Sequence, residues 1–174
     1  MRRLSIFLLS LAFLAISVSH TLSQEQKTGE LNISSPVFDR DIPRKYTCDG
    51  KNINPPLEIK NVPSETKSLA LIVDDLDAPR KTFIHWILWN IDPQVKEIKE
   101  NSVPKGVVQG ISDFKKRSYG GPCPPSGTHR YVFKLFALDL HLDLKPISTV
   151  IDFQNAMKGH VITKTELIGL YGRK

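Results

Sequence analysis

The sequence predicts a β-rich sandwich with one or two small helices. Short apolar runs bounded by turn residues recur along the chain, which is the pattern of short strands in an antiparallel protein. Twelve prolines are scattered between these runs, and their distribution argues against a helical bundle or a regular βαβ repeat. Apolar residues at helical spacing stand out in one segment near the C-terminus.

Four of these runs predict strands in the first 140 residues. Residues 31–34 alternate between apolar and polar side chains and predict a first strand. Residues 37–47 contain prolines and aspartates, which predict a loop that approaches a sheet edge. Residues 68–73 form a continuous apolar run, which is typical of a strand buried on both faces. Residues 83–91 and 130–138 are rich in aromatic and branched side chains and predict two longer strands, the first of them central.

Because side chains alternate along a strand, the two longer runs also predict which residues share a face. His85 is grouped with Phe83, Ile87 and Trp89, and the opposite face holds Ile84, Trp86 and Leu88. The face of His129 also carries Tyr131, Phe133 and Leu135.

Residues 148–158 predict a short helix, with Ser148 as its N-cap and Gly159 as its stop signal. Its apolar residues recur at helical spacing: Val150, Ile151, Phe153 and Met157. Residues 162–171 then predict a last strand.

The first 23 residues predict a secretory signal peptide. Arg2 and Arg3 form a positive start, residues 4–18 supply an apolar core, and small polar residues follow. An apolar run of about 15 residues is short for a membrane span, which needs about 20, and an uncleaved anchor is the alternative. We expect residues 24–174 to form one domain that is secreted or periplasmic, without stable membrane insertion after cleavage.

The charge of the predicted mature chain is modest. Loss of Arg2 and Arg3 leaves 22 of the 24 basic residues against all 18 acidic ones, so the formal charge falls from +6 to +4. Residues 115–117 (KKR) form a basic triplet, which predicts a solvated loop. A nucleic-acid or phospholipid patch is the alternative, but the aromatic residues that would favour it are missing, and no nucleic-acid partner is expected.

Cys48 and Cys123 are the only two cysteines. Both lie in turn-rich segments, and an oxidising compartment favours a disulfide between them over two free thiols. The closed loop would hold about 75 residues, for which chain entropy gives roughly 4 kcal/mol of stabilisation. The sequence has neither a C-x-x-C motif nor the Cys/His spacing of a zinc site.

Residues 120–131, GGPCPPSGTHRY, predict a stiff loop that leads onto a strand. The prolines fix φ and remove backbone donors, whereas the glycines allow turns that other residues avoid. The loop delivers His129 and Tyr131 to one face of that strand. Upstream, a polar turn that holds Asp75 and Asp77 precedes His85. Two carboxylates and two histidines at strand–loop junctions predict a pocket.

The order and spacing of these motifs carry a family resemblance. D-x-D-A-P at 75–79, H-W at 85–86 and the loop at 120–131 resemble the signature blocks of the phosphatidylethanolamine-binding protein family. The similarity is closest to its prokaryotic Raf-kinase-inhibitor-like branch, the YbhB/YbcL type, and covers roughly residues 31–172. Shorter motifs fit that branch at 47–50, 55–57, 109–110 and 113–114. Leu76 and Phe83 replace the family's common proline and tryptophan, and both remain apolar.

The resemblance implies a mainly β fold, a Greek-key antiparallel β-sandwich with one or two small peripheral helices. It also implies a small anion site that accepts phosphate groups and lipid head groups, without a metal or another cofactor. The positions that match the family's ligand-binding residues are Asp75, Asp77, Pro79, His85, Gly121, Pro124, Pro125, His129 and Tyr131.

The chemistry of such a pocket follows from charge. A carboxylate beside an imidazole raises the pKa of the imidazole, whereas burial lowers it. An imidazole beside Asp75 or Asp77 would be cationic near neutral pH and attract an anion. Backbone N–H groups of Gly121, Cys123 and Gly127 would add donors. Singly, each residue also has an ordinary interpretation: a turn-forming aspartate, a satisfied core histidine or a core tyrosine.

Three functional classes use a pocket of this kind. The leading hypothesis is a secreted protein, not an enzyme, that binds a small anion or a phosphorylated head group and regulates a partner. The second, implied by the resemblance, is a kinase or protease inhibitor that acts through the pocket rim. The third is a metal-dependent hydrolase, since two histidines and two carboxylates are also a metal-ligand set. The sequence lacks the H-E-x-x-H and G-x-S-x-G motifs, which weakens the third hypothesis.

Overall fold

The computed structural model describes residues 29–173, which form two antiparallel sheets and one α-helix. The predicted mainly β class is confirmed. The small sheet has the order β1 (Asn32–Ser34), β2 (Leu57–Lys60), β5 (Glu97–Ile98). The large sheet has the order β6 (Val108–Gln109), β4 (Phe83–Ile91), β3 (Ser68–Asp75), β7 (Thr128–Leu138), β8 (Val161–Gly172). The predicted signal peptide, residues 1–23, lies outside the described residues.

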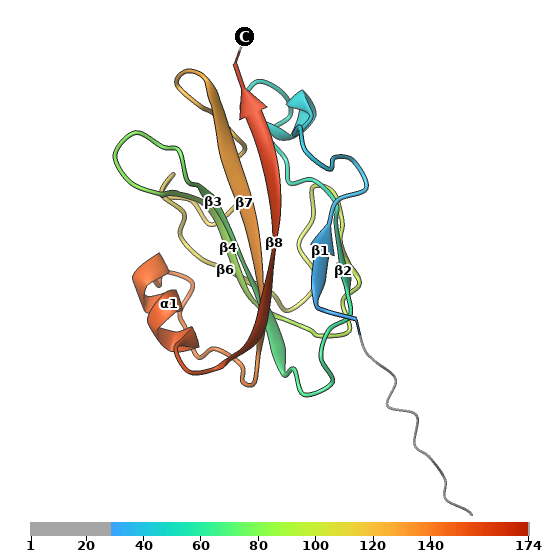
Figure 1. The fold of residues 1–174 in the computed structure, drawn as a ribbon. Coiled ribbons are helices and arrows are strands. Elements are labelled where there is room, and N and C mark those ends of the chain that lie inside the picture. Colours follow the sequence, from blue (N-terminus) through green and yellow to red (C-terminus); the bar gives the residue numbers. More distant parts are fainter. Residues whose placement is uncertain (1–28, 174) are drawn as a thin grey trace, which may run out of the picture.

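The large sheet is covered on both faces (Figure 1). The small sheet lies on one side of it, which we call the inner face, and helix α1 (Val150–Met157) lies on the other, the outer face. Along β3, Leu71 and Val73 enter the inner core, whereas Ala70 and Ile72 enter the cluster beneath α1. This double burial explains why residues 68–73 are apolar without interruption.

A β-bulge at His85 interrupts the pairing of β3 with β4. Val73 pairs with Trp86 and Asp74 with Ile84, so His85 has no partner across the ladder. The predicted faces of β4 are therefore partly wrong. Ile84 lies on the outer face with Ile87 and Trp89, whereas Trp86 and Leu88 lie in the inner core. The bulge shifts the alternation by one residue at the position of the histidine.

The predicted helix is present, but it begins one residue later than expected. Thr149 is the N-cap, in a capping box with Asp152, so Ser148 is not the cap. Phe153 and Met157 are buried beneath α1, whereas Ile151 is 64% exposed. Gly159 has φ +82° and ends the helix as predicted. A 3-10 turn, η1 (Arg44–Tyr46), is the second short helical element of the described chain.

The predicted edge loop at residues 37–47 lies along β8. The N–H of Ile42 donates to the carbonyl of Leu170 at 2.8 Å, and the N–H of Leu170 donates to the carbonyl of Arg40 at 2.7 Å. None of the helices within residues 29–173 is long and apolar enough to cross a membrane.

Candidate functional site

Asp75 and His129 form a buried pair on the inner face of the large sheet. Asp75 ends β3, and His129 stands at the start of β7, where the ladder pairs Asp75 with Tyr131. Asp75 Oδ2 lies 2.8 Å from His129 Nδ1, and the two side chains are 6% and 9% exposed. The sequence predicted that these residues share one pocket, although 54 positions separate them, and it left open which aspartate faces which histidine.

His85 is held through the same ring atom as His129. Its Nδ1 lies 2.7 Å from the carbonyl oxygen of Gly120, which can only accept, so Nδ1 carries the proton. The same reasoning puts a proton on His129 Nδ1, which faces a carboxylate. Burial lowers the pKa of His85, although the Gly120 carbonyl and Asp75 act against it. The His85 ring is therefore neutral near pH 7, and each histidine leaves Nε2 for another partner.

Tyr131 lies between the two histidines. Its ring centroid is 5.2 Å from that of His85 and 6.4 Å from that of His129. The hydroxyl is buried and forms no hydrogen bond of acceptable geometry with a described residue, although the Asp75 carboxylate and the backbone of Cys123 lie near it. Burial raises the pKa of Tyr131, and the Asp75 carboxylate raises it further. A buried unpaired hydroxyl costs about 1–3 kcal/mol, so a ligand oxygen or a water would be stabilised at this position.

Two phenylalanines form an aromatic wall against His85. The rings of Phe83 and Phe114 meet it edge to face, with centroids 5.3 and 5.1 Å away. Gly120 allows this arrangement, because a Cβ there would collide with the ring of Phe114. The wall keeps water from one side of the imidazole, which contributes to the burial that lowers its pKa.

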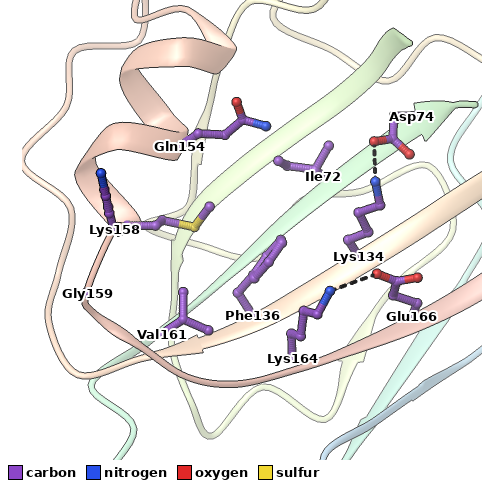
Figure 2. Close-up of a pocket in the computed structure, with 11 residues that line it drawn as sticks. Ile72, Asp74, Lys134, Phe136, Gln154, Lys158, Gly159, Val161, Lys164 and Glu166 are labelled. Carbon is purple, nitrogen blue, oxygen red and sulfur yellow. Dashed lines mark hydrogen bonds and ion pairs between the residues drawn. The ribbon is translucent and has the colours of Figure 1, made fainter.

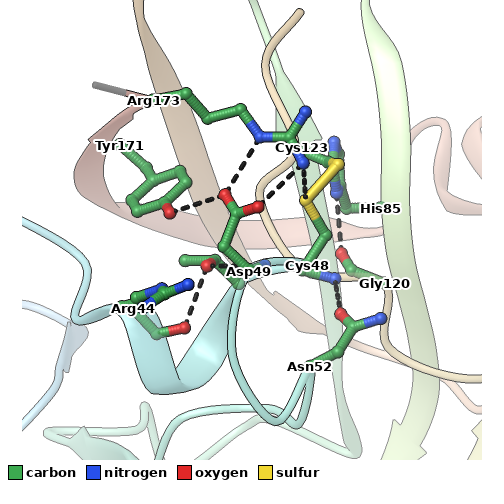
Figure 3. The surroundings of a disulfide bond; sticks show 11 residues. Arg44, Cys48, Asp49, Asn52, His85, Gly120, Cys123, Tyr171 and Arg173 are labelled. Atoms are coloured by element: carbon green, nitrogen blue, oxygen red, sulfur yellow. Dashed lines mark hydrogen bonds and ion pairs between the residues drawn. A yellow bond between two sulfur atoms is a disulfide. The ribbon is translucent and has the colours of Figure 1, made fainter.

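The predicted disulfide is present and fixes the loop beside the site (Figure 3). Cys48 and Cys123 are bonded with their Cα atoms 5.4 Å apart. The N–H of Cys48 donates to the carbonyl of Pro122 at 3.0 Å, and the N–H of Gly121 donates to Asn52 Oδ1 at 2.7 Å. Three bonds thus fasten the loop to the turn at residues 48–52.

The C-terminal end of β8 is fastened to the same turn (Figure 3). Asp49 Oδ1 accepts from Arg173 Nη2 at 2.8 Å, and its Oδ2 accepts from Tyr171 at 2.8 Å and from Arg173 Nε at 3.0 Å. The hydrogen bonds from Arg173 and then Tyr171 lower the pKa of Asp49 to about 2. Arg173 also lies 3.2 Å from the sulfur of Cys48.

A cavity of about 380 Å³ opens beside the disulfide and adjoins the site. It shares Phe114 and Gly120 with the surroundings of His85. Its lining consists of Cys48, Asn52, Phe114, Lys116, Ser118, Tyr119, Gly120, Gly121 and Cys123.

Asp77 has a different partner from the one that the sequence suggested. It forms a two-point ion pair with Arg130, with Nη2 to Oδ1 at 2.6 Å and Nε to Oδ2 at 2.9 Å. The hydrogen bonds from Arg130 lower the pKa of Asp77 to about 2. The N–H of Asp77 donates to Asp75 Oδ1 at 2.9 Å. Asp77 therefore orients Asp75 through its backbone, and its own carboxylate is engaged.

The other predicted ligand-binding positions, three prolines and Gly121, contribute to the shape of the loops and do not offer groups for a ligand. Pro79 and Pro125 are exposed, and Pro124 is buried next to Cys123. The amide of Gly121 is occupied by Asn52, so it is not an available donor as predicted. Sequence reasoning assigned no role to Asn52 or Phe114, because both act through contacts between distant segments. Within residues 29–173, no three His, Cys, Asp or Glu side chains are grouped as a metal site.

Comparison with known proteins decides the family. The family model for phosphatidylethanolamine-binding protein matches residues 33–172. The chain belongs to this family. A family relative from Methanothermobacter thermautotrophicus, a UPF0098 protein, is 51% identical over 150 residues, which cover 82% of this chain and 99% of the relative. A UPF0098 protein of Pyrococcus horikoshii is 49% identical over 154 residues, 83% of this chain and 77% of that protein.

Two solved structures share the fold of this family member. The crystal structure of a putative phosphatidylethanolamine-binding protein homolog from Chlamydia trachomatis matches with a TM-score of 0.79 and 40% identity, over 83% of this chain and 98% of that one. YbcL of E. coli, described as a new member of the mammalian family, matches with a TM-score of 0.79 and 29% identity, over 84% and 100%. The resemblance to the YbcL type is thus confirmed.

Proposed function

We propose that this family member binds a small phosphate-type anion or a phosphorylated head group such as phosphoethanolamine, without turnover. The observation that carries the proposal is the unpartnered Tyr131 hydroxyl, buried between two histidines whose Nδ1 atoms are both engaged. A phosphate oxygen there would accept from the tyrosine and from a protonated Nε2. Hydrogen bonds of this charge-assisted kind are about twice as strong as neutral ones.

The charges of the site divide the ligand into two parts. The phosphate belongs with His85, His129 and Tyr131, because a bare phosphate beside a carboxylate is disfavoured unless a proton or cation intervenes. An ammonium group belongs with Asp75, since Asp77 is engaged by Arg130. Each Asp75 oxygen already accepts one hydrogen bond and has a second lone pair for another.

The site is nearly closed, and this limits the affinity. Asp75, His85, His129 and Tyr131 are each less than a tenth exposed. A ligand that enters from the cavity beside Gly120 must displace part of the loop, so we expect weak binding. The disulfide supports function in an oxidising compartment, and we propose that the mature protein is secreted or periplasmic.

Calorimetric titration with phosphoethanolamine at about pH 6 and pH 8 tests the proposal. Because the neutral His85 must gain a proton to donate from Nε2, affinity should fall as the pH rises. Ionisation of the phosphate near pH 6 adds negative charge to the ligand and would strengthen binding as the pH rises, so a fall in affinity reports the loss of the proton from His85.

Three variants sharpen the test. His129→Ala should abolish most of the binding, whereas His160→Ala removes a matched but exposed His–Asp pair, 2.9 Å from Asp139, and should leave binding unchanged. Lys116→Ala, at the rim of the cavity, should have less effect than His129→Ala. Equal affinity at both pH values together with an unaffected His129→Ala variant would contradict an anion site.

An inhibitor of a kinase or protease is the second candidate. The observation in its favour is the exposed basic triplet Lys115, Lys116 and Arg117, which adjoins the cavity rim. A failure of phosphoethanolamine binding would leave this candidate in front, and inhibition by the wild type but not by a triple alanine variant would support it.

A further inference from the structure

A second buried carboxylate lies on the outer face of the large sheet. Asp74 precedes Asp75 in β3, so its side chain points to the opposite side. That side chain is 6% exposed, and its Oδ2 accepts from Lys134 Nζ at 2.6 Å. Its other oxygen, Oδ1, is buried and has no partner among the described residues.

Stability alone does not explain a carboxylate at this position. The neighbouring outer-face residues Ala70, Ile72 and Ile84 are buried and apolar. Replacing a buried ion pair by apolar residues of similar size is often neutral or stabilising. An unpaired carboxylate oxygen among apolar side chains adds a further cost. Asp74 is therefore a candidate for a contact with a ligand.

Asp74 lines a cavity of about 400 Å³ between α1 and the sheet, which we call the outer groove (Figure 2). Strands β3, β7 and β8 form its floor, and α1 with the turn after it forms its wall. The lining is Ile72, Asp74, Lys134, Phe136, Gln154, Met157, Lys158, Gly159, Val161, Lys164 and Glu166. The volume lies within the range of small-molecule sites, about 300–1,000 Å³.

The charges in the outer groove define the ligand that fits. Asp74 is already neutralised by Lys134, so a second cation at Oδ1 would be repelled, and a neutral O–H or N–H donor suits it better. Lys164 lies 3.4 Å from Glu166, while Lys158 forms no ion pair within residues 29–173. The groove thus holds one uncompensated positive charge beside apolar side chains.

We propose that the outer groove binds a small amphipathic organic acid. The apolar body of the ligand packs against Phe136, Met157 and Val161. A rotation of the Asp74 carboxyl brings the buried Oδ1 to the groove, where it accepts from a hydroxyl or amide N–H of the ligand, and a carboxylate of the ligand meets Lys158. The site is separate from the Asp75–His129 site, because the two lie on opposite faces of the sheet.

N-acetyl-phenylalanine is a suitable probe, since it combines an aromatic ring, an amide N–H and a carboxylate. Titration of the isotope-labelled protein should shift the backbone NMR signals of Phe136 and Met157, with a Kd on the order of 1 mM. The signals of Gly121 and Tyr131 should not move. Saturating phosphoethanolamine should leave the Kd unchanged, whether or not it binds the inner site. Shifts confined to the inner site, or none at all, would overturn the proposal.

Variants and a second probe test the two polar contacts separately. Lys158→Gln should weaken binding about fivefold, and Lys145→Gln, an exposed lysine outside the groove, should not change it. Asp74→Asn should weaken it about tenfold. In the wild type, 3-phenylpropionate, which lacks the amide, should bind at least about threefold more weakly than N-acetyl-phenylalanine. Equal affinity in Lys158→Gln and for both probes would show that Asp74 and Lys134 are only a structural pair.

Discussion

Two consecutive aspartates of β3 show how one strand supplies two different sites. Asp75 faces the inner side and pairs with His129, among aromatic rings and beneath a loop that a disulfide holds. Asp74 faces the outer side and pairs with Lys134, beside a helix of eight residues. Both carboxylates are less than a tenth exposed. The difference between the sites lies in their partners.

The partner determines what each carboxylate can do. An imidazole has two ring nitrogens, so the histidine that pairs with Asp75 through Nδ1 still has Nε2 for a ligand. A lysine ammonium has donors only, so the outer pair is a point charge against a carboxylate and has no second ring nitrogen for a ligand. Burial lowers the pKa of His85 on the inner side and raises the pKa of Asp74 on the outer side, against the effect of Lys134. The same desolvation thus acts with opposite signs on the two faces.

The largest effect should come from the disulfide, which belongs to the inner side alone. Replacing both cysteines by serine should lower the free energy of unfolding by about 4 kcal/mol, because the 75-residue loop is no longer closed in the unfolded chain. Urea unfolding at pH 7 measures this. Phosphoethanolamine binding should weaken as the loop loosens, whereas N-acetyl-phenylalanine should bind as before. An equal loss of affinity for both ligands would mean that the two faces of the sheet are not independent.

A smaller effect should follow from breaking the outer pair. Lys134→Met leaves the Asp74 carboxylate buried without a counter-charge and should cost about 3 kcal/mol. The double variant Asp74→Leu/Lys134→Met replaces the whole pair by apolar side chains and should recover most of that loss. Thermal and urea unfolding of the three proteins form the test. A double variant no more stable than Lys134→Met would show that the pair itself stabilises the fold.

The smallest effect should be the pH dependence of stability, with opposite signs on the two faces. The native pKa of His85 lies below its ordinary 6.5, so its stabilising contribution is complete above pH 6.5 and is lost as the pH falls below that value. The native pKa of Asp74 lies above its ordinary 3.8, so its contribution is lost as the pH rises above 3.8. Each slope is at most about 1.4 kcal/mol per pH unit.

Urea unfolding between pH 4 and pH 7.5 separates the two contributions. The variant His85→Gln should lose less stability than the wild type below pH 6.5, and Asp74→Asn should lose less above pH 3.8. A constant difference between each variant and the wild type across this range would contradict both assignments.

The long strands could be predicted because their apolar runs carry enough periodicity. Strands β2, β5 and β6 have two to four residues and depend on pairing with distant segments, so they were not predicted. The sequence predicted Ser148 as the N-cap, whereas the structure has Thr149 at this position. Asp152, three residues after Thr149, is the capping-box signal that identifies the correct residue.

The inner site was predictable as a set of side chains, but its hydrogen bonds were not. Strand alternation placed His129 with Tyr131, and the motif order placed Asp75 near them. Asp77 pairs with Arg130, whose side chain lies on the opposite face of β7 from those of His129 and Tyr131, and no signal in the sequence indicated this pair. The burial of Asp74 was not predicted, because the predicted strand ended at residue 73, whereas β3 continues as a buried strand to Asp75.

The bulge at His85 has a consequence for the gene and for protein engineering. Without this residue, β4 would alternate regularly from Phe83 to Trp89, with Phe83, Trp86 and Leu88 on one side and Ile84, Ile87 and Trp89 on the other. A second register shift, opposite Leu69 and Leu71, returns Ile91 to the inner core. The imidazole is thus a single codon added to the regular stretch from Phe83 to Trp89, and the other positions of that stretch keep their places in the two cores. To graft such a group onto another antiparallel sheet, one would insert a histidine rather than substitute one.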